Sequence, residues 1–158
     1  MRSFQIGYYI ILLTPLISLV SFWLFLPTVV LGVLQYTLTS IFMTIWSVSI
    51  ILILAVGISL YVYGYLKQQG TVNEEKAILI LGLLLASWGV FTDLIASAFL
   101  SDMILWSMNP DVRALTILDY LQYWTWEAKA TVWIGTAIML IVTSITRIRS
   151  HTRVKFYP

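Results

Sequence analysis

Charged side chains are scarce in this chain of 158 residues, and its first part lacks them. Asp, Glu, Lys and Arg together make up 10% of the sequence, whereas an ordinary soluble protein has about 25%. From Ser3 to Leu66 there is no Asp, Glu, Lys, Arg or His. Such a stretch offers no charged face to water, which excludes an ordinary soluble domain. The hydrophobic share of 60% and the mean hydropathy of +0.93 indicate that the chain lies in lipid.

Cysteine is absent, and histidine occurs once, as His151. The lack of cysteine excludes disulfides, thiolate metal sites, iron–sulfur clusters and a cysteine nucleophile. A single histidine excludes a haem with two histidine ligands and a copper or zinc site built from histidines. The sequence also has no Gly-rich phosphate loop, no metalloprotease helix and no Ser/His/Asp arrangement. We therefore expect no enzymatic activity, no cofactor and no metal site.

The apolar stretches predict an all-α integral membrane protein, with four transmembrane helices in one domain that covers residues 1–158. A membrane span takes about 20 apolar residues, so the long uncharged stretch must hold two spans. Pro27 marks a break between them, because proline is costly inside a helix. The predicted spans are approximately residues 4–26, 40–66, 77–100 and 124–146.

The first span has two further features. Arg2 precedes an apolar stretch with no small-residue cleavage site, so we expect a retained signal anchor. Pro15 lies in the middle of the span and is expected to kink it. Thr14 or a neighbouring helix would then bond the backbone carbonyl that Pro15 leaves without a donor.

Two helix starts are visible in the second half. Asn73 is the predicted N-cap of the third helix, since Glu74 and Glu75 would lie in a first turn that favours negative charge. Pro110 suits the first position of another helix. No Gly or Pro follows until Gly135. This helix therefore either continues into the fourth span, or residues 112–121 form a short amphipathic helix in the outer loop.

The basic residues predict the orientation in the membrane. With four spans, the N-terminus, the turn around residues 67–76 and the C-terminal tail share one side. That side carries seven of the nine basic residues, which are Arg2, Lys67, Lys76, Arg147, Arg149, Arg153 and Lys155. The other side has Arg113 and Lys129. The positive-inside rule places the seven, and both termini, on the cytoplasmic side of a cell or organelle inner membrane.

Asp93 is the one ionisable residue well inside a predicted span. Charged groups inside a membrane are costly and are candidates for function, so Asp93 could be a proton or cation site. It could equally form a structural pair with Lys129 or Arg113, or contact a partner subunit. We favour a structural role, because proton relays usually need a second acid inside the membrane.

Glu127 and Lys129 lie at the outer entrance of the fourth span. They could form a gate or a substrate-binding pair, or they could be interfacial charges on a helix that has not yet entered hydrocarbon. The second interpretation is favoured by four nearby rings of the kind that collect at headgroup level, Tyr120, Tyr123, Trp124 and Trp126.

Two weaker patterns concern lipids and helix packing. The tail residues Arg147, Arg149, Arg153 and Lys155 are predicted to bind anionic headgroups or an acidic partner surface, and no role with nucleic acid is expected. Pairs of small residues four apart allow close helix contact. They occur as Ala55 with Ser59 and as Gly82 with Ala86.

These observations favour a non-catalytic subunit of a larger membrane complex, for example a respiratory or other energy-transducing one, with a structural or assembly role. Its expected partners are membrane lipids and other integral membrane subunits. One alternative is a small homo-oligomeric transporter or channel that uses Asp93. Another is a membrane-embedded structural protein of an envelope or virion, which has the same composition.

Overall fold

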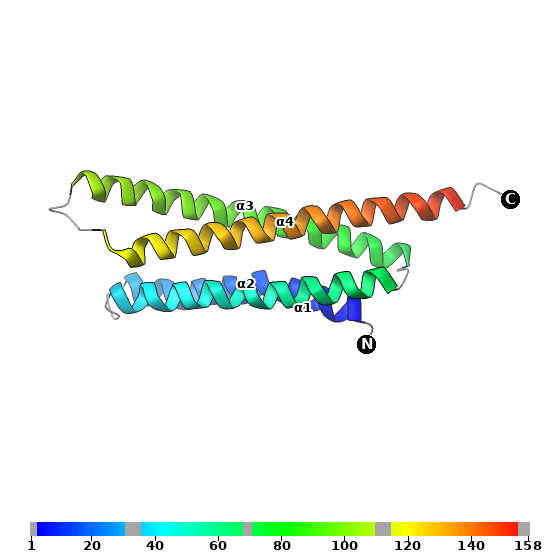
Figure 1. Ribbon diagram of the computed structural model, residues 1–158, viewed down its shortest axis with the longest axis horizontal. Helices are drawn as coiled ribbons and strands as arrows, with labels where there is room; N and C mark the ends of the chain where they lie inside the picture. Colours follow the sequence, from blue (N-terminus) through cyan, green and yellow to red (C-terminus); the bar gives the residue numbers. More distant parts are fainter. Residues whose placement is uncertain (1–2, 31–35, 68–70, 110–114, 155–158) are drawn as a thin grey trace.

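The structure is a computed structural model that describes residues 3–30, 36–67, 71–109 and 115–154. It has four helices, which are α1 Ser3–Val30, α2 Tyr36–Lys67, α3 Val72–Met108 and α4 Ile117–Val154. The helices run alternately up and down along one long axis (Figure 1). As a result α1 begins, and α4 ends, at the end of the bundle where α2 leads into α3.

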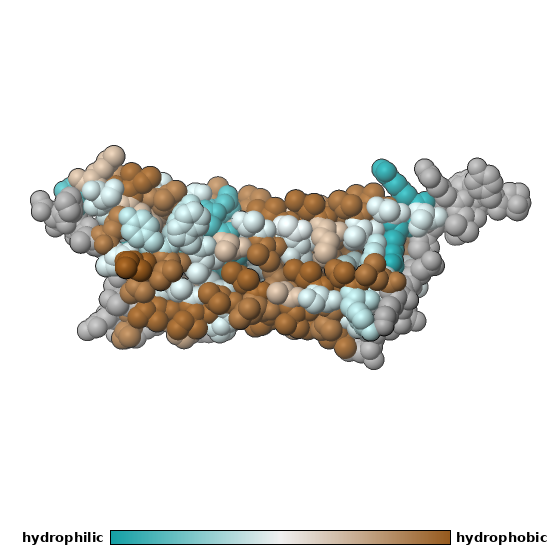
Figure 2. Space-filling model, in the orientation of Figure 1, coloured by the Kyte–Doolittle hydropathy of each residue, from teal (hydrophilic) through white to brown (hydrophobic). Residues whose placement is uncertain are grey.

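Each of the four described helices is long and apolar enough to cross a membrane. Large hydrophobic side chains such as Leu52, Leu84 and Leu94 are exposed on their outer faces. Hydrophilic side chains are gathered mainly in two zones along the axis, with a mostly hydrophobic surface between them (Figure 2). The prediction of an all-helical protein with four helices fit to span a membrane is confirmed, and the surface indicates a membrane-embedded protein.

Helix α3 begins earlier than the sequence suggested. Its N-cap is Thr71. The Thr71 N–H donates to Glu74 Oε2 at 2.7 Å, and the Glu74 N–H donates to Thr71 Oγ1 at 3.3 Å. This reciprocal pair is a capping box, which satisfies two backbone donors at once. The prediction of Asn73 as N-cap is therefore wrong, while Glu74 and Glu75 do lie in the first turn.

Helix α1 passes through both of its prolines. Pro27 does not end it, since the helix continues to Val30. At Pro15 the missing donor leaves the Ile11 carbonyl free, and Thr14 Oγ1 donates to that oxygen at 2.8 Å. The predicted role of Thr14 is confirmed.

Helix α4 begins at Ile117, after two residues, Leu115 and Thr116, that are not helical. Its start is held by Asp119, whose carboxylate accepts from the N–H and the Oγ1 of Thr116 at 2.8 Å each. An uninterrupted helix from Pro110 into the fourth span is therefore wrong. Of the alternative surface helix, residues 112–114 lie outside the described residues, and residues 117–121 belong to the first turns of α4.

The bundle consists of two hairpins. Helix α1 packs mainly on α2, and α3 mainly on α4, while the hairpins meet chiefly between α2 and α4; α1 and α3 barely touch. Glycines bring the backbones together within each hairpin. A Cβ atom on Gly7 would lie 2.7 Å from the Gly57 carbonyl oxygen, and one on Gly64 would lie 2.8 Å from Phe4 Cα.

Glycines also define the antiparallel register of α3 and α4. Gly82 lies against Ala137 and Ile141, and seven residues later Gly89 lies against Ala130 and Ile134. The register stays constant over this distance. A residue of α3 and a residue of α4 form a pair at about the same level along the bundle axis when their residue numbers add up to the same total as these contacting pairs.

This register places polar residues of α3 and α4 at two shared levels along the bundle axis. Glu75 and Arg147 share one level and form an ion pair. Asp93 lies 18 residues after Glu75, and Lys129 lies 18 residues before Arg147, so these two share a second level. At a rise of 1.5 Å per residue the levels are about 27 Å apart, close to the roughly 30 Å thickness of the hydrocarbon layer.

Candidate functional site: an enclosed lysine

A cavity of about 50 Å³ lies between the four helices, in the half of the bundle nearer to the α1–α2 and α3–α4 connections. Three tryptophans, three serines and one threonine contribute to its wall together with one charged group. The lining residues are Ser18, Ser21, Met43, Trp46, Ser47, Trp88, Phe91, Thr92, Ile95, Trp126 and Lys129. Lys129 is the only charged residue in this lining.

The Lys129 side chain is enclosed by the protein and is 8% exposed. Its Nζ donates a hydrogen bond of 3.3 Å to Ser47 Oγ on α2. The same atom lies 5.7 Å from the ring centroids of both Trp126 and Trp133, within cation–π distance. The ammonium group therefore points into the bundle, which the sequence did not predict, while the interfacial depth expected for Lys129 stays a prediction.

A relay of hydrogen bonds connects this region to the proline of α1. The Trp133 indole N–H donates to Thr14 Oγ1 at 3.3 Å, and Thr14 in turn donates to the Ile11 carbonyl. Trp133 and Ile11 are both fully buried. The Trp133 ring beside Lys129 is thus fixed by hydrogen bonds that run from α4 to α1.

Asp93 does not line the cavity, although its neighbour Thr92 does. The Asp93 side chain is half-buried on α3, and together with Glu127 it lies within electrostatic reach of the Tyr123 hydroxyl. Among the described residues neither Lys129 nor any other cation forms an ion pair with Asp93. The other predicted cation, Arg113, lies outside the described residues.

Glu127 and Lys129 therefore point in different directions, although only one residue separates them. Glu127 and Tyr123 are one helical turn apart on α4, whereas Lys129 faces the cavity. The structure does not bring the two charges together as a gate. Within the described parts of the chain, no three His, Asp or Glu side chains gather as a metal site would require.

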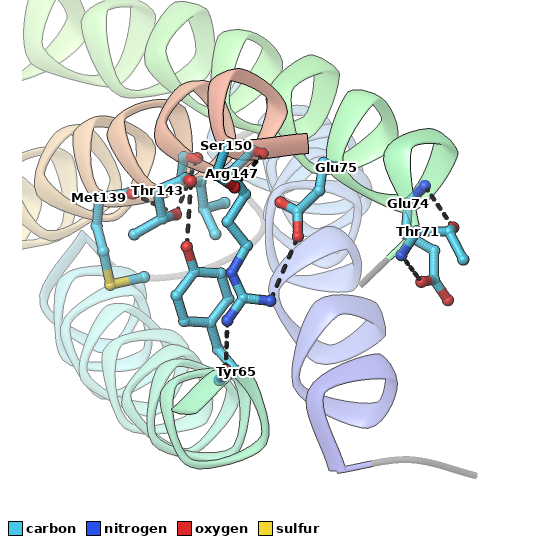
Figure 3. A network of polar contacts seen from close by, with 9 residues as sticks. Tyr65, Thr71, Glu74, Glu75, Met139, Thr143, Arg147 and Ser150 are labelled. Carbon is cyan, nitrogen blue, oxygen red and sulfur yellow. Dashed lines mark hydrogen bonds and ion pairs between the residues drawn. The ribbon is translucent and has the colours of Figure 1, made fainter. Parts of the chain in front are cut away.

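A second polar cluster lies at the other level (Figure 3). Arg147 Nη1 lies 3.5 Å from Glu75 Oε1, and Arg147 Nη2 donates to the Tyr65 carbonyl at 2.6 Å. The guanidinium carbon also lies 3.5 Å from the Tyr65 ring centroid, and the Tyr65 hydroxyl donates to the Thr143 carbonyl at 3.1 Å. Glu75 is 1% exposed. This cluster joins α2, α3 and α4, and the sequence interpretation assigned no such role to Glu75 or Arg147.

The remaining predicted positions are placed as follows. Of the four tail cations, Arg147 belongs to the buried cluster and Arg149 is exposed, while the side chains of Arg153 and Lys155 lie outside the described residues. Gly82 contacts α4, but Ala55 and Ser59 are exposed on α2. The glycine pairs Gly57 with Gly64 and Gly82 with Gly89, each seven residues apart, were the stronger sequence signal for close packing.

Comparison of this chain with protein-family models, curated proteins and solved structures found no match. The site is therefore interpreted from its own geometry.

Proposed function

We propose that this protein is a non-catalytic integral subunit of a larger membrane complex, with both termini on the cytoplasmic side and a role in assembly. The observation that carries the proposal is the length of the bundle. Helices α3 and α4 have 37 and 38 residues, about 55 Å each. A bilayer measures only about 40–45 Å, headgroups included.

The two polar levels suggest where the membrane lies. The basic end, with the exposed residues Lys76 and Arg149 near the Glu75–Arg147 pair, suits the headgroups on one side. The level of Asp93 and Lys129 then falls near the opposite edge of the hydrocarbon layer. Met108 lies 15 residues beyond Asp93, and Ile117 lies 12 residues before Lys129. The bundle therefore extends about 18–22 Å past that edge, which exceeds a headgroup layer of roughly 5–8 Å.

This extension has an apolar surface, which we call the apolar tip. Its residues are Leu38, Phe42, Leu105, Met108, Ile117 and Trp124, with exposed fractions between 44% and 78%. The average helix tilt of about 20° shortens the projected length by only roughly 6%, which does not draw the tip into the membrane. Exposed apolar patches of this kind mark interaction sites. Another protein subunit that covers the tip would remove these side chains from water.

Transport through Asp93 has less support. A coupling carboxylate should face a hydrated path, but Asp93 is not among the residues that line the cavity. A structural protein of an envelope would instead cover the tip with copies of the same chain. That alternative predicts a homo-oligomer, which biochemical isolation distinguishes from a complex of different subunits.

The test is to isolate the tagged chain from its native membrane in a mild detergent and to identify stoichiometric partners by mass spectrometry. The double variant Leu105→Ser with Ile117→Ser should lower partner recovery about tenfold, because apolar anchors dominate interface energies. Membrane insertion should be unchanged, since both positions lie beyond the hydrocarbon layer.

The matched control is Asp102→Asn with Ser107→Ala, which alters exposed polar residues of the same part of α3 and should leave partner recovery unchanged. Isolation of the wild-type chain as a monomer or a clean homo-oligomer would overturn the proposal. Partner recovery that is insensitive to the tip variant would do so as well.

A further inference from the structure

The cavity around Lys129 has a positive charge without a negative one. No Asp or Glu occurs among its lining residues. Asp93 and Glu127, the acids nearest in sequence and level, do not line it and lie within electrostatic reach of Tyr123 instead. One hydroxyl and two indole rings stabilise the ammonium group only in part. Buried charges in proteins are normally paired, because the loss of hydration is costly.

The cavity also has more hydrogen-bond donors than its own side chains use. The indole Nε1 atoms of Trp46 and Trp88 are buried and have no acceptor within the described structure, and both residues line the cavity. The hydroxyl protons of Ser21 and Thr92 are already donated to the backbone carbonyls of Ile17 and Trp88. Free N–H donors and a cation around one space are the chemistry of an anion site.

The dimensions restrict the ligand. A volume of about 50 Å³ holds roughly three to five waters, or one small anion in their place. Phe91 lines the cavity and is also 49% exposed, so one wall reaches the outer surface of the bundle. The side on which α1 and α3 barely touch offers the least packed route to it.

We propose that this cavity binds a monovalent anion of halide or carboxylate size, held by the Lys129 ammonium and by the indole N–H groups of Trp46 and Trp88. The anion is either a free small ion or the carboxylate of a single-chain amphiphile that enters from the membrane. This site shares no lining residue with the apolar tip, although Phe42 of the tip stacks on Trp46, and it does not depend on the proposed subunit role.

Bromide provides the probe, because it quenches tryptophan fluorescence and is the size of the proposed ligand. The purified full-length protein is titrated with sodium bromide in a nonionic detergent, at constant ionic strength. Three of the seven tryptophans line the cavity. The wild type should show a saturable quenching component in addition to the linear, collisional quenching of exposed rings such as Trp124.

Variants locate the site. Lys129→Met keeps an unbranched side chain that is one heavy atom shorter but removes the charge, and it should abolish the saturable component. Arg149→Met removes the same charge from an exposed position of α4 and should leave saturation unchanged. The double variant Trp46→Phe with Trp88→Phe keeps the rings but removes both donors. It should raise the half-saturating bromide concentration about tenfold or more, as expected for lost hydrogen bonds to a charged group, with Trp126 as the remaining reporter.

The double variant also covers the case in which Lys129→Met fails to give a monodisperse helical protein. Purely linear quenching in the wild type would overturn the proposal. Saturation that persists unchanged in a folded Lys129→Met protein, or in the double tryptophan variant, would overturn it too.

Competition then identifies the source of the anion. Laurate that displaces bromide at far lower concentration than acetate, while neutral dodecanol has no effect, assigns the site to a membrane amphiphile. Equal displacement by acetate and laurate assigns it to a small soluble anion. Displacement by dodecanol as efficient as that by laurate would show that the cavity selects the acyl chain, which contradicts an anion site.

Discussion

At the scale of single residues, the protein encloses two cations in different ways. Arg147 is neutralised directly by Glu75 and is also bonded to the Tyr65 carbonyl. Within the part of the chain that the structure describes, the Lys129 ammonium group contacts one hydroxyl and two indole rings and forms no ion pair. The first arrangement joins three helices and leaves no unpaired charge. The second leaves a charge available to a ligand.

The Glu75–Arg147 pair gives a prediction about stability. Glu75→Gln would remove the negative charge that Glu75 places beside Arg147, and losing one partner of a buried pair costs about 3–5 kcal/mol. The Arg147 side chain is 19% exposed and keeps some contact with solvent, so we expect a loss of about 2–3 kcal/mol in the free energy of unfolding. The measurement is reversible unfolding of the purified protein in mixed detergent micelles.

The neighbouring glutamate is the control. Glu74 acts through the capping box, where glutamine can take the same place. Glu74→Gln should therefore change the free energy of unfolding by less than about 0.5 kcal/mol. Equal losses for the two variants would contradict the structural role assigned to the ion pair.

Sequence reasoning reached some of these residues and missed others for physical reasons. The bond from Thr14 to the Ile11 carbonyl could be predicted, because proline always removes the donor for the carbonyl four residues earlier. The burial of Lys129 could not, because it depends on which face of α4 meets α2. The Glu75–Arg147 pair joins residues 72 positions apart, and only the tertiary register brings them together.

At the scale of the helices, glycine positions decide how closely neighbours approach. Gly7 and Gly64 lie where the backbones of α1 and α2 meet, with Tyr61 Cα and Phe4 Cα 2.8 Å from the positions that Cβ atoms would occupy. Gly135 on α4 has no atom within 4 Å of such a position. The same substitution should therefore have opposite effects at the two kinds of site.

We expect Gly7→Ala to destabilise the protein by about 1–3 kcal/mol, since the new methyl group would push against backbone that cannot move without separating the helices. Gly135→Ala should instead stabilise it by about 0.5–1 kcal/mol, because alanine restricts the unfolded chain and favours the helix. Both values come from the same unfolding measurement. Destabilisation by Gly135→Ala, or tolerance of Gly7→Ala, would show that the helices pack differently.

The helices themselves were largely predictable, but their ends and contacts were not. Long apolar stretches are sufficient to predict four helices. The end of α1 was misplaced because proline breaks helices in water more strictly than inside a membrane protein. The start of α3 was misplaced by two residues because Asn73 and Thr71 are both good caps, and only Thr71 has glutamate three positions later.

At the scale of the whole molecule, the bundle is longer than a bilayer, and its placement decides what its polar and apolar parts do. In the proposed placement the Glu75–Arg147 level lies at the cytoplasmic edge, the middle of α3 faces lipid and the apolar tip projects on the outer side. The positive-inside rule gives this orientation from the sequence. A long fourth helix was one of the two alternatives for the sequence, but the excess length of α3 was not foreseen, because the sequence marks where apolar spans lie and not how far their helices continue.

Single cysteines can test this placement, because the natural chain has none. Ser87, Ser107 and Ser150 are exposed serines, and each can be changed to cysteine with little perturbation. A membrane-impermeant maleimide reacts with a thiolate, which forms in water and not in hydrocarbon. Ser150→Cys should react only from the cytoplasmic face and Ser107→Cys only from the outer face. Ser87→Cys, about 18 Å along α3 from Glu75, should react from neither face.

The same three variants relate placement to assembly. Ser107→Cys should react readily in the chain produced alone and slowly in the intact complex, if a partner subunit covers the apolar tip. Reaction of Ser150→Cys from the outer face would reverse the orientation. Protection of Ser107→Cys in the isolated chain would place the tip inside the membrane. The level of Asp93 and Lys129 would then lie deep in hydrocarbon, where an anion bound by Lys129 would be needed all the more to balance its charge.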